Sequence, residues 1–168
     1  MDRKYRLKIR EATMEDCYDM WIWRNRPAVR KWCFDAKKIS YKSHKEWFGK
    51  AHNDKYVRIY IVENVKKEKI GTVRFKIKIN RQNCAYLSVY LNSLFLGKGF
   101  GHRIVKKATD FFLKEKEGVT HIIAEVFEDN IASQRVFEKA SYVLVKRMTK
   151  QNKKIKVFMY ERGYGFGY

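Results

Sequence analysis

The sequence contains a single proline, Pro27, and no stretch rich in serine, glycine and proline. Linkers between domains are usually rich in such residues, so a chain of 168 residues without one is expected to form one domain. Apolar residues make up 45% of the chain and aromatic residues 15%, which excludes a mainly disordered protein. We therefore predict one domain over residues 1–162, followed by a short tail at 163–168.

Cysteine is scarce, and its three copies, Cys17, Cys33 and Cys84, lie far apart. An odd number of cysteines without a Cys-x-x-Cys pair does not suit a disulfide framework, and no group of His and Cys has the spacing of a zinc site. We expect free thiols in a reducing compartment, and no metal site.

Long apolar runs are absent as well. No run reaches the length of about 18 residues that a membrane-spanning helix needs, and the start of the chain lacks the apolar core of a signal peptide. Together with the free thiols, this predicts a cytoplasmic protein without a membrane span.

Acidic residues are few: Lys and Arg number 38 against 18 Asp and Glu, giving a net charge of +20. Such an excess attracts polyanions, whether nucleic acid, a membrane surface or a phosphorylated small molecule. A basic surface that is merely solvated is the alternative, and charge alone does not choose between these partners.

Hydrophobic periodicity outlines the first half of the chain. Residues 5–10 alternate between apolar and basic side chains, which predicts a strand. A helix is expected from its cap at Thr13 to residues 24–26, because Pro27 interrupts the pattern. With Ser43 as its cap, a second and shorter helix is expected to follow.

The second half combines strands with two further helices. Short polar turns join three alternating runs, which predicts an antiparallel meander; it is followed by a strand–loop–helix–strand unit of the parallel crossover type, then a helix and a hairpin. The expected segments are strands at 57–61, 70–79 and 85–91, a helix from 100 to about 118, a strand at 121–127, a helix at 130–140 and hairpin strands at 142–148 and 155–160.

A glycine loop lies where the third meander strand gives way to a helix. Gly97, Gly99 and Gly101 let backbone N–H groups approach an anion without interference from a Cβ, and the helix N-terminus and Lys98 add positive charge. The spacing matches neither the dinucleotide fingerprint nor the Walker loop. The loop is suited to a pyrophosphate; a tight turn without a ligand is the alternative.

These glycines lie in a segment that resembles the acetyl-CoA motif of the GNAT superfamily of acetyltransferases. The motif, Gln/Arg-x-x-Gly-x-Gly/Ala, is matched at Gly99 and Gly101, whereas Leu96 stands where Gln or Arg is usual. Residues 125–142 are similar to the second family motif, with Ser141 in place of its glycine. The resemblance covers nearly the whole chain. It implies an α/β (α+β) fold with a mixed, mostly antiparallel sheet of about seven strands, flanked by helices and splayed between two central parallel strands.

The resemblance implies that acetyl-CoA is the acetyl donor, with its pantetheine arm along the backbone of residues 88–91. Asn130 would reach the pantetheine amide, and as an alternative it caps its helix. Lys98 or His102 would supply the charge that Leu96 does not. The expected cofactor-binding residues are Val89, Tyr90, Leu91, Leu96, Gly97, Lys98, Gly99, Phe100, Gly101, His102, Asn130, Ser133 and Phe137.

Acetyl transfer to an amine needs a base, because the attacking amine must be neutral. Glu125 is the candidate base, since a carboxylate inside an apolar strand is costly unless it is used or paired; a salt-bridged glutamate on a half-exposed sheet is the alternative. His44 is a candidate proton relay or substrate contact, or else a solvated histidine. Phe137 replaces the tyrosine acid of many family members and cannot donate a proton. Ser133 and Tyr142 carry nearby hydroxyls, with Ser133 retained as a catalytic candidate.

Residues 23–32 and 39–48 resemble the amino-sugar N-acetyltransferases of bacterial nonulosonic (pseudaminic-type) acid synthesis. That resemblance implies the 4-amino group of a UDP-linked amino-dideoxy sugar as the acceptor. Trp23, Arg24, Asn25, Trp32 and His44 are the expected substrate-binding residues, while Trp21 and Trp47 are expected in the core.

Two other functions remain open at this point. One is acetylation of a protein or peptide amine, for instance on a ribosomal protein. The other is a non-catalytic RNA-binding module that uses the basic hairpin at 146–156. The apolar residues of that hairpin alternate as in a core rather than forming a base-stacking platform, so nucleic acid is not the expected partner. A monomer and a homodimer are both compatible with the sequence.

Overall fold

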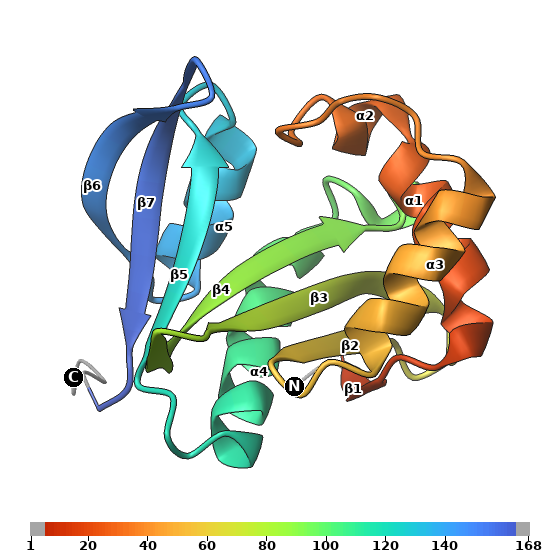
Figure 1. Cartoon of the computed structure of the whole chain (residues 1–168), viewed down its shortest axis with the longest axis horizontal. Helices are drawn as coiled ribbons and strands as arrows, with labels where there is room; N and C mark the ends of the chain where they lie inside the picture. Colours follow the sequence, from red (N-terminus) through yellow and green to blue (C-terminus); the bar gives the residue numbers. More distant parts are fainter. Residues whose placement is uncertain (1–5, 164–168) are drawn as a thin grey trace.

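The computed structural model describes residues 6–163, apart from the side chain of Gln82. Tyr5 of the predicted first strand and residues 164–168 of the predicted tail lie outside the described part. Seven strands form one sheet in the order β1-β2-β3-β4-β5-β7-β6 (Figure 1). The strands are β1 (Lys8–Glu11), β2 (Val57–Glu63), β3 (Lys69–Lys78), β4 (Arg81–Leu91), β5 (His121–Phe127), β6 (Val143–Lys150) and β7 (Lys153–Glu161).

Helices occupy both faces of this sheet (Figure 1). Two 3-10 turns, η2 (Met14–Asp16) and η3 (Ser93–Phe95), precede α1 and α4 respectively. The helices are α1 (Cys17–Asn25), α2 (Pro27–Arg30), α3 (Tyr41–His52), α4 (Phe100–Glu115) and α5 (Ile131–Lys139).

The predicted mixed sheet is confirmed. Every neighbouring pair of strands is antiparallel except β4 and β5, which are parallel. A parallel pair needs a crossover connection, and α4 provides it. The sheet therefore consists of an N-terminal half, β1 to β4, and a C-terminal half, β5 to β7, joined by one parallel pair.

Alternation along β2 builds a core on each face of the N-terminal half. Ile59 and Ile61 pack with Met20 and Phe48 of α1 and α3. Tyr60 lies in the larger core, beneath α4. The two cores show why the chain needs helices on both sides, because a strand that is apolar on both faces must be covered twice.

The start of α3 differs from the sequence prediction. Its N-cap is Ser40, whose hydroxyl accepts a hydrogen bond from the Ser43 backbone N–H at 3.1 Å, so the helix begins at Tyr41 and is longer than expected. Ser43 lies inside the helix and is not its cap; its hydroxyl accepts a hydrogen bond from that of Ser40 at 2.8 Å. Pro27 does end α1 as predicted, and it also occupies the first turn of the additional short helix α2.

None of the helices among residues 6–163 combines the length and the apolar character that crossing a membrane requires.

Candidate active site

The parallel strands β4 and β5 separate after three residue pairs. Cys84, Ala85 and Tyr86 pair with residues 121–123, and pairing stops there. Beyond this point β4 stays bonded to β3 as far as Leu91, while β5 stays bonded to β7 as far as Phe127. Each strand thus presents one backbone edge that lacks a strand partner, and the two edges face each other across a V-shaped gap. The predicted splay is confirmed.

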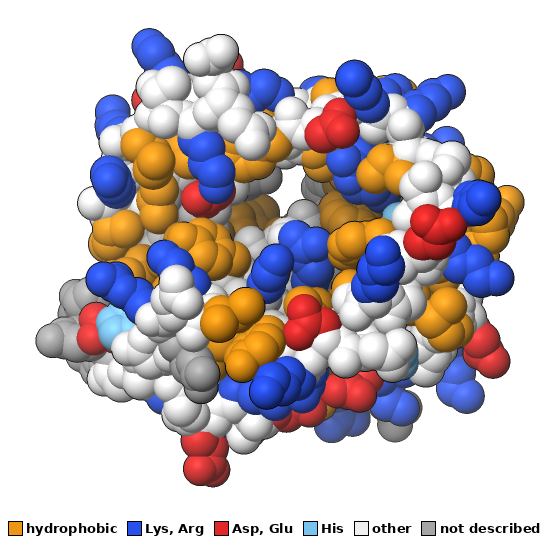
Figure 2. Space-filling view, in the orientation of Figure 1, with side chains coloured by type: hydrophobic (Ala, Val, Ile, Leu, Met, Phe, Trp, Pro, Cys, Tyr) orange, Lys and Arg blue, Asp and Glu red, His pale blue; other side chains and the backbone are white. Residues whose placement is uncertain are grey.

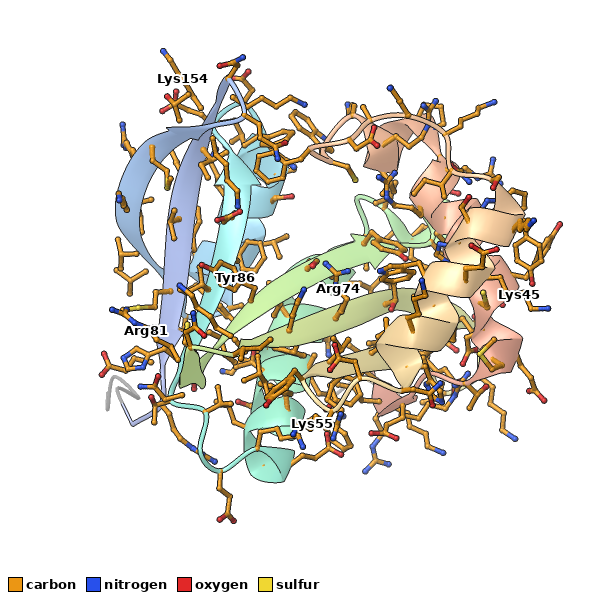
Figure 3. The ribbon with its side chains drawn as sticks, in the orientation of Figure 1. Lys45, Lys55, Arg74, Arg81, Tyr86 and Lys154 are labelled. Carbon is orange, nitrogen blue, oxygen red and sulfur yellow. The ribbon has the colours of Figure 1, made fainter. Side chains whose placement is uncertain are left out.

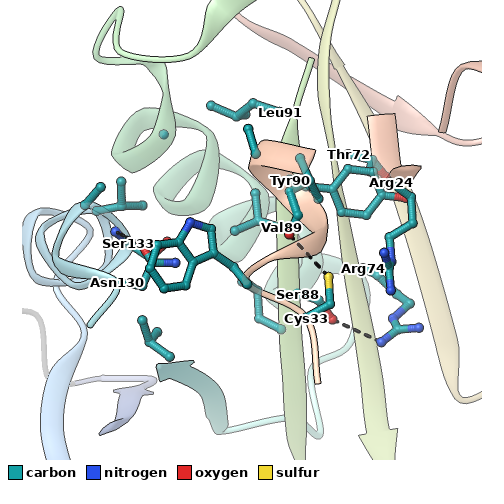
Figure 4. Close-up of a pocket in the computed structure, with 18 of the residues that line it drawn as sticks. Arg24, Cys33, Thr72, Arg74, Ser88, Val89, Tyr90, Leu91, Asn130 and Ser133 are labelled. Atoms are coloured by element: carbon teal, nitrogen blue, oxygen red, sulfur yellow. Dashed lines mark hydrogen bonds between the residues drawn. The ribbon is translucent and has the colours of Figure 1, made fainter. Parts of the chain in front are cut away.

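A cavity of about 890 Å³ occupies this gap and extends toward α1 and α3. Figure 2 shows it as a hollow that opens on one face of the molecule. Its volume falls within the range of about 300–1,000 Å³ that is usual for small-molecule sites. In the close-up of Figure 4, Ser133 and Asn130 lie on one side of the cavity and Arg24, Arg74 and Tyr90 on the other.

The glycine loop forms one end of the cavity. Gly97 and Gly99 have φ values of +72° and +75°, a region that other residues rarely adopt, and Gly99 is the N-cap of α4. The loop thereby directs the N-terminus of α4 toward the gap, where the helix dipole favours negative charge. Gly101 has a different role: a Cβ there would lie 2.7 Å from Cγ2 of Val136, so glycine allows α4 and α5 to approach closely.

This close approach gives a prediction. Gly101→Ala should lower the free energy of unfolding by about 1–3 kcal/mol, because an added methyl group has no room beside Val136. In an exposed helix the same change would instead stabilise by up to about 1 kcal/mol. Combined with Val136→Ala, it should become neutral or stabilising, as urea unfolding would measure. Stabilisation by Gly101→Ala in both backgrounds would contradict the close packing.

The residues predicted to bind the cofactor line the cavity, with one exception. Val89, Tyr90 and Leu91 line it from β4, and the glycine loop does so from Leu96 to His102. Lys98 is the exception: its Nζ lies 5.7 Å from the ring centre of Phe95, and the residue is not part of the cavity wall.

Two basic residues at the same end were missed from the sequence. Arg135 and Lys139 of α5 line the cavity near His102, whose pKa is lowered by burial and by the nearby charges of Lys139 and Arg103. Their spacing of four residues places them on one face of α5. The spacing is visible in the sequence, but it indicates that Arg135 and Lys139 line a binding site only once α5 is known to pack beside the start of α4.

Asn130 and Ser133 meet at the start of α5. Asn130 is 6% exposed, and its Oδ1 accepts a hydrogen bond from the Ser133 backbone N–H at 3.1 Å, so the predicted helix cap is present. Within residues 6–163 its Nδ2 has no hydrogen-bond acceptor, and both residues line the cavity. Asn130 therefore retains a free donor on the cavity side.

Glu125 lines the cavity from β5, and its side chain lies on the same face of the sheet as that of Phe127. Its Oε2 accepts a hydrogen bond from Nζ of Lys150 at 2.6 Å, and its side chain is 18% exposed. No other described side chain donates to the carboxylate, so Oε1 is left for a ligand or water. The ion pair of the alternative interpretation is present, and Glu125 also lines the cavity, so its role as the base stays a prediction.

His44 is buried, contrary to the alternative of a solvated histidine. It is 2% exposed, lines the cavity, and its Nε2 has no hydrogen-bond partner among the described residues. Burial lowers its pKa to about 4, the charge of Arg24 acts in the same direction, and a hydrogen bond to the Cys17 backbone opposes both. At neutral pH the imidazole is uncharged and presents Nε2 as an acceptor.

The buried histidine makes stability depend on pH. Because the pKa in the folded state, about 4, is below the ordinary value of 6.5, the unfolded chain binds the proton more tightly. His44 thus contributes stability above pH 6.5 that is lost as the pH falls toward 4, by up to about 1.4 kcal/mol per pH unit. Urea unfolding at pH 7, 6 and 5 should show a steeper loss in the wild type than in His44→Gln. Parallel profiles would contradict the burial of a neutral histidine.

Two arginines line the half of the cavity that faces α1 and α3. One nitrogen of Arg24, Nη2, donates to the Asp35 carbonyl at 2.8 Å, while Nη1 is buried and has no hydrogen-bond partner within residues 6–163. Arg74 donates to Ser88 Oγ at 3.1 Å, and burial lowers its pKa. Figure 3 shows Arg74 in the hollow above β3 and β4. Burial also raises the pKa of the Tyr90 phenol beside them, although Arg74 and Arg24 oppose the rise.

The predicted substrate-binding residues divide into two groups. Arg24, Trp32 and His44 line the cavity. Trp23 does not, because it is 5% exposed and belongs to the core beneath α1 and α3. Asn25 also lies outside the cavity wall, where its side chain makes two hydrogen bonds of 2.9 Å with the Ile39 backbone.

The two tryptophans expected in the core are not buried there. Trp47 is 36% exposed and lines the cavity, with Arg74 5.6 Å from its ring centre. Trp21 is half-buried, and its indole N–H donates to the Ile39 carbonyl at 2.7 Å.

Neither Phe137 nor Tyr142 offers an acidic proton to the cavity. Phe137 is 4% exposed and contributes only its ring to the cavity wall. Tyr142 is outside the wall, and its hydroxyl shares a hydrogen bond of 2.7 Å with Thr109 Oγ1, while burial raises its pKa. Of the two hydroxyl-bearing candidates, Ser133 and Tyr142, Ser133 is the one that lines the cavity.

Comparison with known proteins identifies the fold and the family. The model of the acetyltransferase (GNAT) domain matches residues 6–143. A spermidine N-acetyltransferase from Vibrio cholerae in complex with CoA and spermine is similar at a TM-score of 0.83 and 18% identity, over 93% of this chain and 95% of that one. The aminoglycoside acetyltransferase AAC(6′)-Ib in complex with coenzyme A is similar at 0.82 and 20% identity, over 94% and 95%. No curated protein sequence matches significantly. The family model covers most of the chain, and the chain belongs to the GNAT acetyltransferase family.

Proposed function

We propose that this protein transfers the acetyl group of acetyl-CoA to the 4-amino group of a UDP-linked amino-dideoxy sugar. The observation that carries the proposal is the gap between β4 and β5, which opens into one cavity with two differently built ends. The glycine loop and α5 form one end, and Arg24, Arg74 and His44 form the other. The family supports acetyl transfer, and the chemistry of the second end supports the acceptor.

The first end has the features that coenzyme A needs. The start of α4 and the basic residues Arg135 and Lys139 suit its phosphates, and the unpaired edge of β4 offers backbone groups to an amide-rich arm. Asn130 Nδ2 adds a donor for an amide carbonyl. Two similar structures are complexes with coenzyme A, which supports the same donor here.

The second end favours an acceptor that carries negative charge. Two arginines, Arg24 and Arg74, line this end of the cavity, and the acidic residue beside them in the wall is Asp35. A buried guanidinium nitrogen without a partner is costly, and an anionic ligand would remove that cost at Arg24 Nη1. Spermine, bound by one of the similar proteins, is a polycation and would meet like charges here. A sugar linked to a diphosphate supplies both the amine and the anion.

In the proposed transfer reaction, Glu125 and His44 have different roles. When bound, acetyl-CoA would supply a thioester, so that a C–N bond forms, the C–S bond breaks and coenzyme A leaves as the thiolate, which takes up a proton from solvent. Glu125 accepts the proton that the amine loses, directly or through a water at Oε1. His44 Nε2 accepts a hydrogen bond from the acceptor. The thiolate has a pKa of about 8.5 in solution, so a strong acid is not required for its departure.

A thiol-release assay with purified protein tests the proposal. The panel contains acetyl-CoA with a UDP-linked 4-amino-6-deoxy sugar, spermidine, kanamycin or a peptide with a free amine. Release with the sugar is expected, and Arg74→Gln should raise the KM for the sugar without changing the affinity for acetyl-CoA. Release with spermidine or the peptide but not with the sugar would overturn the acceptor, and no release with any amine would overturn the proposed reaction.

A further inference from the structure

Residues 31–36 cross the top of the cavity, and we call them the strap. They leave α2 in irregular conformation, and their loop extends from α2 in the direction of β5 (Figure 1). Three contacts join the strap to the C-terminal half of the sheet. Phe34 and Trp32 meet the ring of Phe127 edge-on, with ring centres 5.1 Å and 6.4 Å apart, and Lys153 Nζ donates to the Cys33 carbonyl at 3.5 Å.

A fourth contact connects the strap to the candidate base. Lys150 Nζ lies 5.1 Å from the ring centre of Phe34, a distance typical of a cation–π contact. The same Nζ makes the 2.6 Å hydrogen bond to Glu125 Oε2. Lys150 is thus held from two directions, by the face of Phe34 and by the carboxylate. Because its side chain is 39% exposed, neither contact alone would fix so flexible a group.

We infer that Lys150 is a positioning residue for the transfer reaction: held by Phe34 of the strap, it orients the Glu125 carboxylate so that Oε1 faces the acceptor amine. This inference rests on the proposed function, in which Glu125 accepts the amine proton. With Oε2 bound to Lys150, the carboxylate cannot rotate freely about its last bond. Oε1 then keeps one direction, toward the cavity.

The end of the cavity formed by Arg24, Arg74 and His44, which we call the acceptor end, is connected to the strap through Arg24. Arg24 lines the cavity and holds the strap through Nη2, which donates to the Asp35 carbonyl at 2.8 Å, while its buried Nη1 has no hydrogen-bond partner in the described part of the chain. An anion bound at Nη1 would fix the guanidinium and, through Nη2, the strap. A correctly charged acceptor would therefore favour the arrangement of Phe34 and Lys150 that orients Glu125.

Kinetics of Lys150 variants test this inference. Lys150→Gln removes the charge and should lower kcat about 10- to 100-fold with the KM of both substrates within twofold, since misplacing a reacting group by about 1 Å can cost this much. Lys150→Arg keeps both contacts and should retain most of kcat. Phe34→Leu should lower kcat less than Lys150→Gln does. The kcat of the double variant, Phe34→Leu with Lys150→Gln, should be no lower than that of Lys150→Gln alone. Lys146→Gln, on the same strand and without a side-chain partner among the described residues, is the control.

A second measurement separates this inference from the proposed function. The ¹³C resonance of the Glu125 carboxyl carbon should move in Phe34→Leu and Lys150→Gln but stay near its wild-type position in Lys150→Arg and Lys146→Gln. If the wild type transfers no acetyl group, the proposed function fails, while the resonance still reports whether Lys150 holds Glu125. Unchanged kcat and an unmoved resonance in Lys150→Gln would each overturn the inference. So would an equal loss of kcat in Lys146→Gln.

Discussion

Glu125→Gln should lower kcat by about 10²- to 10⁴-fold, the usual contribution of a positioned general base. Glutamine keeps the shape of the side chain and removes the site that accepts the proton. The affinity for acetyl-CoA, measured by calorimetry, should stay unchanged, because the phosphate-binding end of the cavity is built from other residues. The stability should change little, since the ion pair with Lys150 is only partly buried.

Glu128→Gln is the matched control for this variant. Glu128 follows β5 directly, is half-buried, and does not line the cavity, so its replacement should leave kcat near the wild-type value. A kcat for Glu125→Gln equal to that of the wild type across the accessible pH range would exclude Glu125 as the base. His44, the other acceptor group at the junction, would then be the group to test.

Asp16→Asn should have the largest effect on stability, about 3 kcal/mol or more, because it breaks a buried ionic network. Asp16 is 1% exposed and joins three elements: Arg10 Nη1 lies 2.7 Å from Oδ2, Lys69 Nζ 2.8 Å from Oδ1, and the Thr13 backbone N–H donates at 2.8 Å. Urea unfolding would measure the loss. Asp19→Asn, which removes only the exposed partner of Lys69, should cost less than about 1 kcal/mol.

The same network should respond to acid. Burial would raise the pKa of Asp16, but hydrogen bonds from Arg10, Lys69 and the Thr13 amide outweigh it and hold the pKa well below its usual range. The carboxylate therefore contributes stability above the ordinary value of 3.8, and this is lost as the pH falls below it. Equal stability of wild type and Asp16→Asn at neutral pH would show that the network is not stabilising.

Local chemistry in the sequence was sufficient to predict most of the elements and the glycine loop before α4. Gly99 and Gly101 lie where the loop needs a positive φ and a close helix approach, and Asn130 caps the helix that its position suggested. The positive φ of Gly99 and the cap at Asn130 are short-range effects, decided within a few residues, whereas the close approach at Gly101 depends on Val136 of α5. The loop of Gln151 and Asn152 likewise has positive φ at both residues, as a tight hairpin requires.

Features that depend on tertiary contacts were not predictable in this way. Ser40 and Ser43 are both good caps by residue type, and the sequence alone does not show that Ser40 is the one that accepts from the backbone of α3. Trp21 is the tryptophan of α1 that the sequence predicts in the core, whereas Trp23 is the one that packs against β2 and α3. Helical spacing alone does not say which side of a short helix is covered.

The acceptor end could not be assembled from the sequence because its residues come from distant segments. Arg24 and Arg74 lie on α1 and β3, and neither carries a local signal of burial. The pairing of Lys150 with Glu125 depends on the register of β6 on β7 and of β7 on β5. Such contacts follow from the sheet as a whole rather than from any motif.

The central claim is that the gap between β4 and β5 binds acetyl-CoA, and an NMR titration of ¹⁵N-labelled protein tests it most directly. Adding acetyl-CoA should shift the backbone amide signals of residues 89–91 and 97–102 together and saturably, while those of the outer strand β6 near Val143 stay in place. Unchanged signals at both segments, or shifts confined to surfaces outside the gap, would contradict the account.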